Sequence, residues 1–177
     1  EGLPASLSEL LTLRGPWQEQ YRNPNFEVKV PTLNLGCSHG GDNPNRICGC
    51  CNLHIDLRPI PGMDLDELRA ILDTRLHKLF DQTAMQWQRL PLFTGVAAMH
   101  THSSSAIVQA AEKLTGHDSE TVAFCTEGPY LNAMGMETII LGPGDIDQAH
   151  QPDEFLALDR LQPTVALLES LIRRFCL

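Results

Sequence analysis

Residues 51–72 read CNLHIDLRPIPGMDLDELRAIL, and they hold a strand, a corner and the start of a helix. Before the corner, apolar and polar side chains alternate: Leu53 and Ile55 share one face, and His54 lies on the other. This alternation predicts a strand with one buried face. After the RPIPG corner, Asp64 is expected to cap a helix. The stretch therefore predicts a mixture of α and β structure in the first half of the chain.

The segments on either side extend this pattern. Ser6 and Glu9 have the spacing of a capping box, so a first helix is expected to begin there and to end at Gly15-Pro16. The helix after Asp64 has an apolar stripe with steps of three and four residues: Leu65, Leu68, Leu72, Leu76 and Leu79. Further strands are expected over residues 26–35, with a bulge or edge position at Pro31, and around Met85–Leu90. The order α-β-β-α-β matches a βαββαβ split fold without its first strand.

The composition changes after about residue 91. A helix is expected from Ser103 or Ser104 to Gly116, and a last helix from about Pro163. Two short strands are expected between these helices, at Thr121–Phe124 and Glu137–Leu141. Two strands are too few for an independent sheet, so the second half resembles the end of a larger α/β domain. The predicted class is thus α/β: a domain of split βαββαβ ferredoxin-like type over residues 1–94, then part of an α/β domain over residues 95–177.

The composition excludes several classes of function. The 177 residues are 42% hydrophobic and 20% charged, which is ordinary for a globular protein. The formal net charge of −9 and the lack of a Lys/Arg run argue against a nucleic-acid partner. No apolar run approaches the roughly 20 residues that span a membrane. The N-terminus has no basic region typical of a signal peptide and resembles an internal position. Three of the six cysteines fall within Cys48–Cys51, a poor disulfide framework, so reduced thiols and a cytoplasmic location are expected.

Two late loops hold side chains that are suited to chemistry. In LGPGDIDQAHQPDEF, His150 lies in a glycine-opened acidic loop, where it is either a metal ligand or a solvated histidine. In FCTEGPY, Thr126 and nearby backbone N–H groups would hold a substrate carboxylate, and Glu127 would act as an acid or base. The alternative for this loop is an ordinary strand-to-helix turn.

Other candidates lie in the first half and at the join. Arg58 ends a strand on its polar face, where it would either grip a carboxylate through two bonds or form a surface ion pair. Asn45 is either a substrate contact or a turn residue. Cys50 and Cys51 would point to opposite faces of a strand, which argues against a zinc site at the cysteines 48, 50 and 51. His100 and His102 have the H-x-H spacing of a chelate, but exposed loop histidines are the simpler interpretation.

Five motifs occur in a shared order: YRNPNFEVKVPTLNLG, HGGDNPNRICGCC, DLRPIPGM, FCTEGPY and LGPGDIDQAHQPDEF. Together they resemble the dinuclear-zinc aminoacylase and desuccinylase family, and within it the acetylornithine deacetylases. The resemblance implies a catalytic α/β domain interrupted by a lid, or dimerisation, domain, and a cytoplasmic homodimer. It implies hydrolysis of N²-acetyl-L-ornithine to L-ornithine and acetate in arginine biosynthesis. It also implies two zinc ions for each complete active site, with cobalt as an alternative.

The resemblance also implies roles for individual residues. His150 matches the family's C-terminal metal ligand, Asn45 and Arg58 match lid residues that reach the substrate, and Thr126 matches a loop that binds the substrate α-carboxylate. The family's other metal ligands and its general base have no match here, so no catalytic residue is assigned. The sequence therefore predicts a portion of a deacetylase that is inactive alone. The alternatives are a non-catalytic dimerisation or interaction module and a metal or redox module at Cys48–Cys51.

Overall fold

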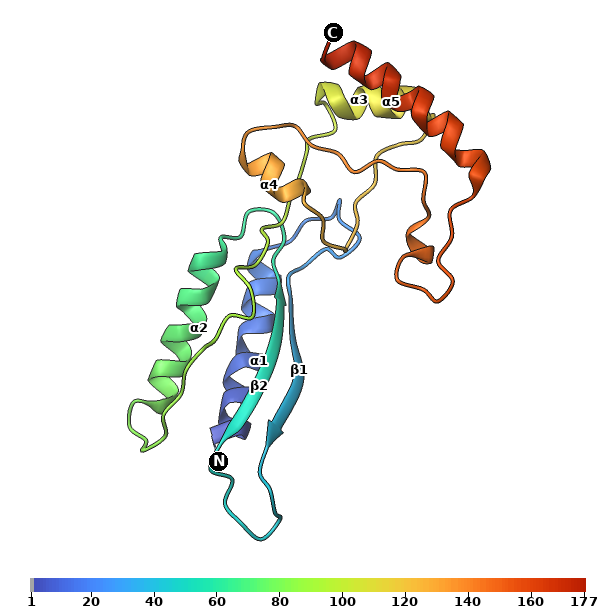
Figure 1. The fold of residues 1–177 in the computed structure, drawn as a ribbon. Coiled ribbons are helices and arrows are strands. Elements are labelled where there is room, and N and C mark those ends of the chain that lie inside the picture. The colour runs from blue at the N-terminus through green and yellow to red at the C-terminus, as the bar shows by residue number, and fades with distance from the viewer. Residues whose placement is uncertain (1) are drawn as a thin grey trace. The chain divides into compact units, whose positions relative to one another are not determined.

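A computed structural model describes residues 2–177 and divides the chain into two compact units. The first unit contains the residues up to His100 together with Thr121–Cys125. The second unit contains Thr101–Glu120 and Thr126–Leu177. Helices and a small antiparallel sheet give the first unit an α+β architecture (Figure 1). The coarse prediction of mixed α and β structure is confirmed.

The first unit is built from two helices and a long β-hairpin. Its elements are α1 (Gly2–Gln20), β1 (Thr32–Gly40), β2 (Cys51–Arg58) and α2 (Leu65–Phe80). β2 lies where the alternation around residue 54 predicts a strand. It pairs antiparallel with β1, and a bulge interrupts the ladder between Leu35 and Cys37. The segment before Thr32, predicted to be a strand from Phe26 onward, is a series of turns and bends.

One face of the hairpin supports the core. Both helices contribute to the same cluster of buried side chains, and so do the hairpin and the corner after it: Leu10, Leu13, Trp17, Leu33, Ile60, Met63, Leu68 and Leu72. Leu53, Ile55 and Leu57 of β2 pack against this cluster, while the residues that alternate with them are exposed. The sheet therefore has one buried face and one open face, and every polar side chain assigned to β2 lies on the open face.

The first helix is longer than the sequence predicts. α1 continues through Pro16 to Gln20, and Ser6 lies inside it, with its hydroxyl donating to the Gly2 carbonyl (3.0 Å). The predictions of a cap at Ser6 and an end at Gly15-Pro16 are therefore wrong. Leu10, Leu13 and Trp17 form one buried helical stripe that crosses the proline. Burial of Trp17 favours continuation of the helix and offsets the backbone hydrogen bond that a proline cannot donate.

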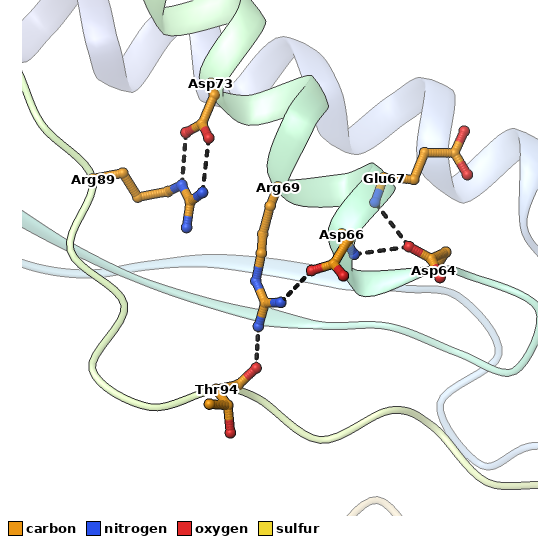
Figure 2. Close-up of polar contacts among 7 residues, drawn as sticks. All are labelled: Asp64, Asp66, Glu67, Arg69, Asp73, Arg89 and Thr94. Atoms are coloured by element: carbon orange, nitrogen blue, oxygen red, sulfur yellow. Dashed lines mark hydrogen bonds and ion pairs between the residues drawn. The ribbon is translucent and has the colours of Figure 1, made fainter. Parts of the chain in front are cut away.

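The start of α2 agrees with the sequence. The Asp64 carboxylate accepts hydrogen bonds from the backbone N–H groups of Asp66 (2.8 Å) and Glu67 (2.9 Å), as Figure 2 shows. Such a cap satisfies two of the N–H groups that have no partner inside a helix. Of the predicted stripe, Leu68 and Leu72 are fully buried, because they lie at its centre.

The segment predicted as a strand at Met85–Leu90 has no regular secondary structure and belongs to no sheet. Side chains hold it along α2 instead. Arg89 makes two bonds to the Asp73 carboxylate (2.6 and 2.7 Å), and Arg69 links Asp66 to the Thr94 carbonyl (Figure 2). The Trp87 ring packs edge-on against His77, with ring centroids 4.7 Å apart. A helix cannot offer a ladder of backbone partners, so the local strand preference is not realised.

The Arg89–Asp73 pair predicts a change in acid stability. Arg89 lowers the pKa of Asp73 below its usual value, so the pair stabilises the fold above the unfolded-state pKa of about 3.9. That contribution is lost as the pH falls through the lower folded-state pKa. Arg89→Met should therefore reduce the free energy of unfolding at neutral pH by about 1 kcal/mol or less, since both side chains are partly exposed. It should also flatten the loss of stability at acid pH, as measured by urea unfolding at a series of pH values.

Lys78→Met is the control for that experiment, because it removes a cation from the exposed side of the same helix. The control should keep the wild-type acid dependence. If the free energy of unfolding falls equally with pH in Arg89→Met and in the wild type, the Arg89–Asp73 pair contributes nothing to acid stability.

The second unit is helical. It contains α3 (Ala106–Thr115), α4 (Gly128–Ala133), two 3₁₀ turns (Ile146–Gln148 and Leu158–Arg160) and α5 (Leu161–Phe175). α3 ends where predicted, because Gly116 adopts a left-handed conformation (φ 75°) that glycine allows without strain. α3 and α5 pack together (Figure 1).

The strands predicted at Thr121–Phe124 and Glu137–Leu141 are not present in the described structure. Each segment lacks a neighbouring strand with which to exchange backbone hydrogen bonds. In α5, Leu171 is the buried residue, whereas Val165, Leu168 and Ile172 are 42–52% exposed.

Within residues 2–177, the structure contains no helix long and apolar enough to cross a membrane.

Candidate functional site

Arg58 lies at the last position of β2, on the open face of the sheet. Its Nε donates to the Asp56 carboxylate (2.8 Å), and its Nη1 donates to the Ala123 carbonyl (3.4 Å). Ala123 precedes Thr126 by three residues in the chain. The guanidinium is therefore held between its own strand and a segment that returns to the first unit from the second half of the sequence.

Electrostatics keep Arg58 fully charged. The hydrogen bond and the negative charge of Asp56 raise the pKa of Arg58 above its already high value. The side chain is 64% exposed, so most of the guanidinium remains open to solvent. A planar cation that is oriented on one edge and free on another suits recognition of a carboxylate. Arg58 therefore forms the surface ion pair with Asp56, and the exposed part of its side chain leaves room for a ligand.

Asn45 lies in the exposed connection between β1 and β2. Its backbone N–H donates to the Asn43 side-chain oxygen (3.2 Å), and the Asn43 carbonyl accepts from Arg46 (3.1 Å). Asn43 thus closes the turn, and this leaves the Asn45 side chain exposed at its tip. The turn function that the sequence offered for Asn45 is performed by Asn43.

Thr126 lies just before the short helix α4. Its hydroxyl accepts a hydrogen bond from the Gly128 N–H (3.1 Å), and the residue is half-buried. Glu127 is exposed and makes no capping bond to α4. Thr126 therefore orders the first turn of α4, and Glu127 extends from that turn into solvent.

His150 lies in a loop with an unusual backbone. Its φ is 61°, a left-handed value that costs energy for a residue with a side chain. Its N–H donates to the Glu154 carboxylate (3.1 Å), which closes the loop over four residues. The imidazole is exposed. Since this bond uses the backbone of His150, both ring nitrogens are left for other partners.

A shallow hollow of about 420 Å³ lies beside the His150 loop. Its lining comes from the two ends of the loop: Pro143, Gly144, Asp145, Gln148, Glu154, Phe155 and Leu156. The Asp145 carboxylate accepts from the Asp147 N–H (3.1 Å) and so stabilises the 3₁₀ turn at Ile146–Gln148. Asp145 therefore shapes the loop, and His150 is not among the residues that line the hollow.

The donors around His150 do not make up a dinuclear zinc centre. Such a centre needs several His, Asp, Glu or Cys side chains around each ion. In the described part of the chain, no three such side chains are grouped so that they could hold a metal. One exposed imidazole is insufficient to hold such a centre by itself.

The remaining sequence candidates do not form a site. Cys48, Cys50 and Cys51 are exposed thiols in and after the hairpin connection, and Cys48 donates to the Cys50 carbonyl (2.8 Å). His100 packs edge-on against Phe26, with ring centroids 5.7 Å apart, and His102 bonds through Nδ1 to the Ser104 hydroxyl (2.6 Å). Each histidine therefore serves its local structure.

Sequence reasoning missed two residues that position the candidates. Asp56 holds Arg58, and Glu154 closes the loop at His150. A signal was available for Asp56, because residues i and i+2 of a strand share a face. No comparable periodicity exists in the His150 loop, so Glu154 could be identified only from the structure.

Comparison with known proteins adds two findings. Residues 5–84 match a family described as a peptidase dimerisation domain. The acetylornithine deacetylase of Edwardsiella ictaluri (strain 93-146) is 44% identical over 171 residues, which cover 97% of this chain and 44% of that protein. The acetylornithine deacetylases of Aliivibrio fischeri (strain ATCC 700601 / ES114) and Vibrio vulnificus (strain CMCP6) are 43% and 44% identical, over 94% and 96% of this chain.

The chain spans less than half the length of these relatives: the matched regions make up 44–45% of each. The similarity extends well beyond residue 84, where the match to the dimerisation domain ends. Both halves of the chain, with Arg58 in one and His150 in the other, therefore take part in the match.

Proposed function

The chain is related in sequence to the acetylornithine deacetylases, and from that relationship we propose that it forms part of a metal-dependent amidohydrolase. The reaction is hydrolysis of N²-acetyl-L-ornithine to L-ornithine and acetate, a step of arginine biosynthesis in the cytoplasm. The observation that carries the proposal is identity of 44% over 97% of the chain, which includes the second half as well as the dimerisation domain.

The proposed architecture has two parts. Residues 1–94 form the lid domain, whose order α1-β1-β2-α2 corresponds to the inner four elements of a split βαββαβ fold. Residues 95–177 form the closing part of an α/β catalytic domain. The bounds of the two parts are those predicted from the sequence. The match of residues 5–84 to a peptidase dimerisation domain supports the first part.

Three residues are proposed to contact the substrate. Arg58 is oriented by Asp56 and stays charged, as an anchor for a carboxylate must. Asn45 is at the exposed tip of the hairpin connection, from which it would reach a substrate across a dimer. Thr126 lies at the start of α4 beside backbone N–H groups that suit the substrate α-carboxylate.

His150 is proposed as one ligand of a centre that holds two zinc ions, or cobalt in their place. Its side chain is exposed and its ring nitrogens are not used by the loop. Metal ions in such a centre polarise the amide carbonyl and lower the pKa of a bound water. The other ligands and the general base come from outside these 177 residues, so no catalytic residue is assigned within them.

The partners follow from the same premise. The match to a peptidase dimerisation domain supports a homodimer that forms through the lid. The substrate is a small N-acyl amino acid, and neither nucleic acid nor membrane is a proposed partner. A second candidate, a dimerisation module without catalysis, is favoured by the fact that the family match ends at residue 84.

Enzyme assays distinguish these two functions. Acetylornithine hydrolysis and bound zinc are measured on the 177-residue chain and on an extended chain, in which the N-terminal segment of a related acetylornithine deacetylase precedes it. We expect zinc and activity in the extended chain only. If the extended chain folds as a dimer but neither binds zinc nor hydrolyses the substrate, the interaction module is the correct function. Hydrolysis by the 177 residues alone would contradict the proposal that the other metal ligands and the general base lie outside them.

Arg58→Lys tests the substrate anchor in the extended chain. A lysine keeps the charge but replaces a planar fork with a single ammonium group, so KM should rise roughly ten-fold, equivalent to about 1.4 kcal/mol, with kcat little changed. Arg46→Lys is a matched control, because Arg46 also forms a surface ion pair, with Asp42 (3.0 Å), and should leave KM unchanged. A wild-type KM for Arg58→Lys would exclude two-bond recognition of a carboxylate by this side chain.

A further inference from the structure

The open face of the hairpin carries two histidines and a cysteine side by side. In the register of the ladder, Cys37 faces His54, and His39 faces Asn52. These four residues are exposed. The face is therefore rich in nitrogen and sulfur donors, away from the buried side that packs on the helices.

The bulge explains how Cys37 reaches this face. Leu33 and Leu35 point toward the helices, and strict alternation would send Cys37 the same way. The irregularity between Leu35 and Cys37 shifts the phase by one residue. Cys37 consequently pairs with the open-face residue His54.

The two imidazoles have a spacing that a shared metal ion requires. The rings of His39 and His54 are 5.7 Å apart between centroids, with an interplanar angle of 73°. Two imidazoles on one tetrahedral ion have ring centres roughly 5–6 Å apart, because each metal–nitrogen bond is about 2.0–2.1 Å. The separation of the two rings is therefore compatible with chelation of one ion.

Cys37 is the nearest third donor by register. Side chains that face each other across an antiparallel ladder have Cβ atoms about 4.5–5.5 Å apart. No three-donor group is already assembled in residues 2–177, so the thiol must change rotamer to join the histidines. An exposed side chain has room for such a change. Asp56, the nearest acid along β2, is already engaged by Arg58 (2.8 Å).

We propose that His39, His54 and Cys37 form a binding site for one divalent ion of the zinc and cobalt class on the open face of the hairpin. Two imidazoles and a thiolate suit such ions, and solvent would complete a four-coordinate shell. Since the donors must lose their protons to bind, the affinity should fall as the pH is lowered.

Titration of the 177-residue chain with Co²⁺ under reducing conditions tests this site. We expect one ion per chain and a near-ultraviolet thiolate-to-cobalt charge-transfer band, with displacement of the cobalt by Zn²⁺. His39→Ala and His54→Ala should each weaken binding about ten-fold or more, and Cys37→Ser should remove the band. Far-ultraviolet circular dichroism should be unchanged in all three variants, because the three side chains are exposed.

Two controls make the test specific. Cys48→Ser removes another exposed thiol of the hairpin, and His117→Ala removes an exposed histidine of the second unit. Both should keep wild-type affinity and the charge-transfer band. Wild-type binding by the His54→Ala variant, loss of the band in Cys48→Ser, or no bound ion at all would overturn the proposal.

Discussion

Replacement of His150 by alanine in the extended chain is expected to lower bound zinc by one ion per subunit and the rate of acetylornithine hydrolysis by about 100-fold or more. Loss of partners that merely orient a metal ligand costs about 10–100-fold in affinity or activity, so loss of a ligand should cost at least as much. The fold should survive, because the imidazole is exposed and the loop is closed by the His150 backbone N–H, which alanine retains.

His117→Ala is the matched control, since His117 is another exposed histidine of the same unit and lies in the turn after α3. Metal content by atomic emission, kcat and the melting temperature should be unchanged in that variant. If His150→Ala also keeps its full complement of zinc and its rate, the imidazole is not a ligand. A fall in melting temperature with unchanged zinc would show that His150 only shapes its loop.

The second large effect is expected on stability. Leu10→Ala should lower the free energy of unfolding of the first unit by about 3 kcal/mol or more, since leucine truncation in a core costs about 2–5 kcal/mol. Leu10 is 2% exposed and lies between the two helices and the hairpin in the core cluster. The cavity would open beneath residues from four different parts of the chain, which limits how far they can collapse into it.

The neighbouring residue supplies the control for this prediction. Leu11 is 44% exposed on the same helix, so Leu11→Ala should cost about 1 kcal/mol or less. Urea unfolding followed by tryptophan fluorescence reports on the correct unit, because Trp17 and Trp87 both belong to it. Equal costs for the two leucines would mean that the buried stripe of α1 is not in the core.

The features that were predicted correctly depend on residues close to them in the sequence. The alternation around His54 identified β2, and Asp64 identified the start of α2 through local hydrogen bonds. Gly116 identified the end of α3, because the left-handed conformation needed there favours glycine. In each case the information lies within a few residues of the feature.

Long-range packing decided the elements that were predicted wrongly. Burial of Trp17 carries α1 past Pro16. Arg89 and Trp87 hold the Met85–Leu90 segment against α2 rather than against another strand. A strand preference is realised only where a second strand is available to pair with it. The segments at Thr121–Phe124 and Glu137–Leu141 lack such a partner in the described structure, so they do not form strands.

The candidate site was predicted to the level of residue types and motifs. The polar face of β2 and the glycine-opened loop at His150 were evident from the sequence. Their positioning partners depend on tertiary geometry: the Ala123 carbonyl reaches Arg58 from 65 residues away. The roles of Asn45, Arg58, Thr126 and His150 remain proposals that the variants described here test.

Crystallography of the extended chain with zinc, using anomalous scattering at the zinc absorption edge, tests the central assignment most directly. We expect an anomalous peak within about 2.0–2.1 Å of an imidazole nitrogen of His150, with the remaining protein ligands drawn from residues outside the 177. A complete zinc centre that leaves the His150 imidazole in solvent would contradict it, as would a centre built wholly from donors inside this chain.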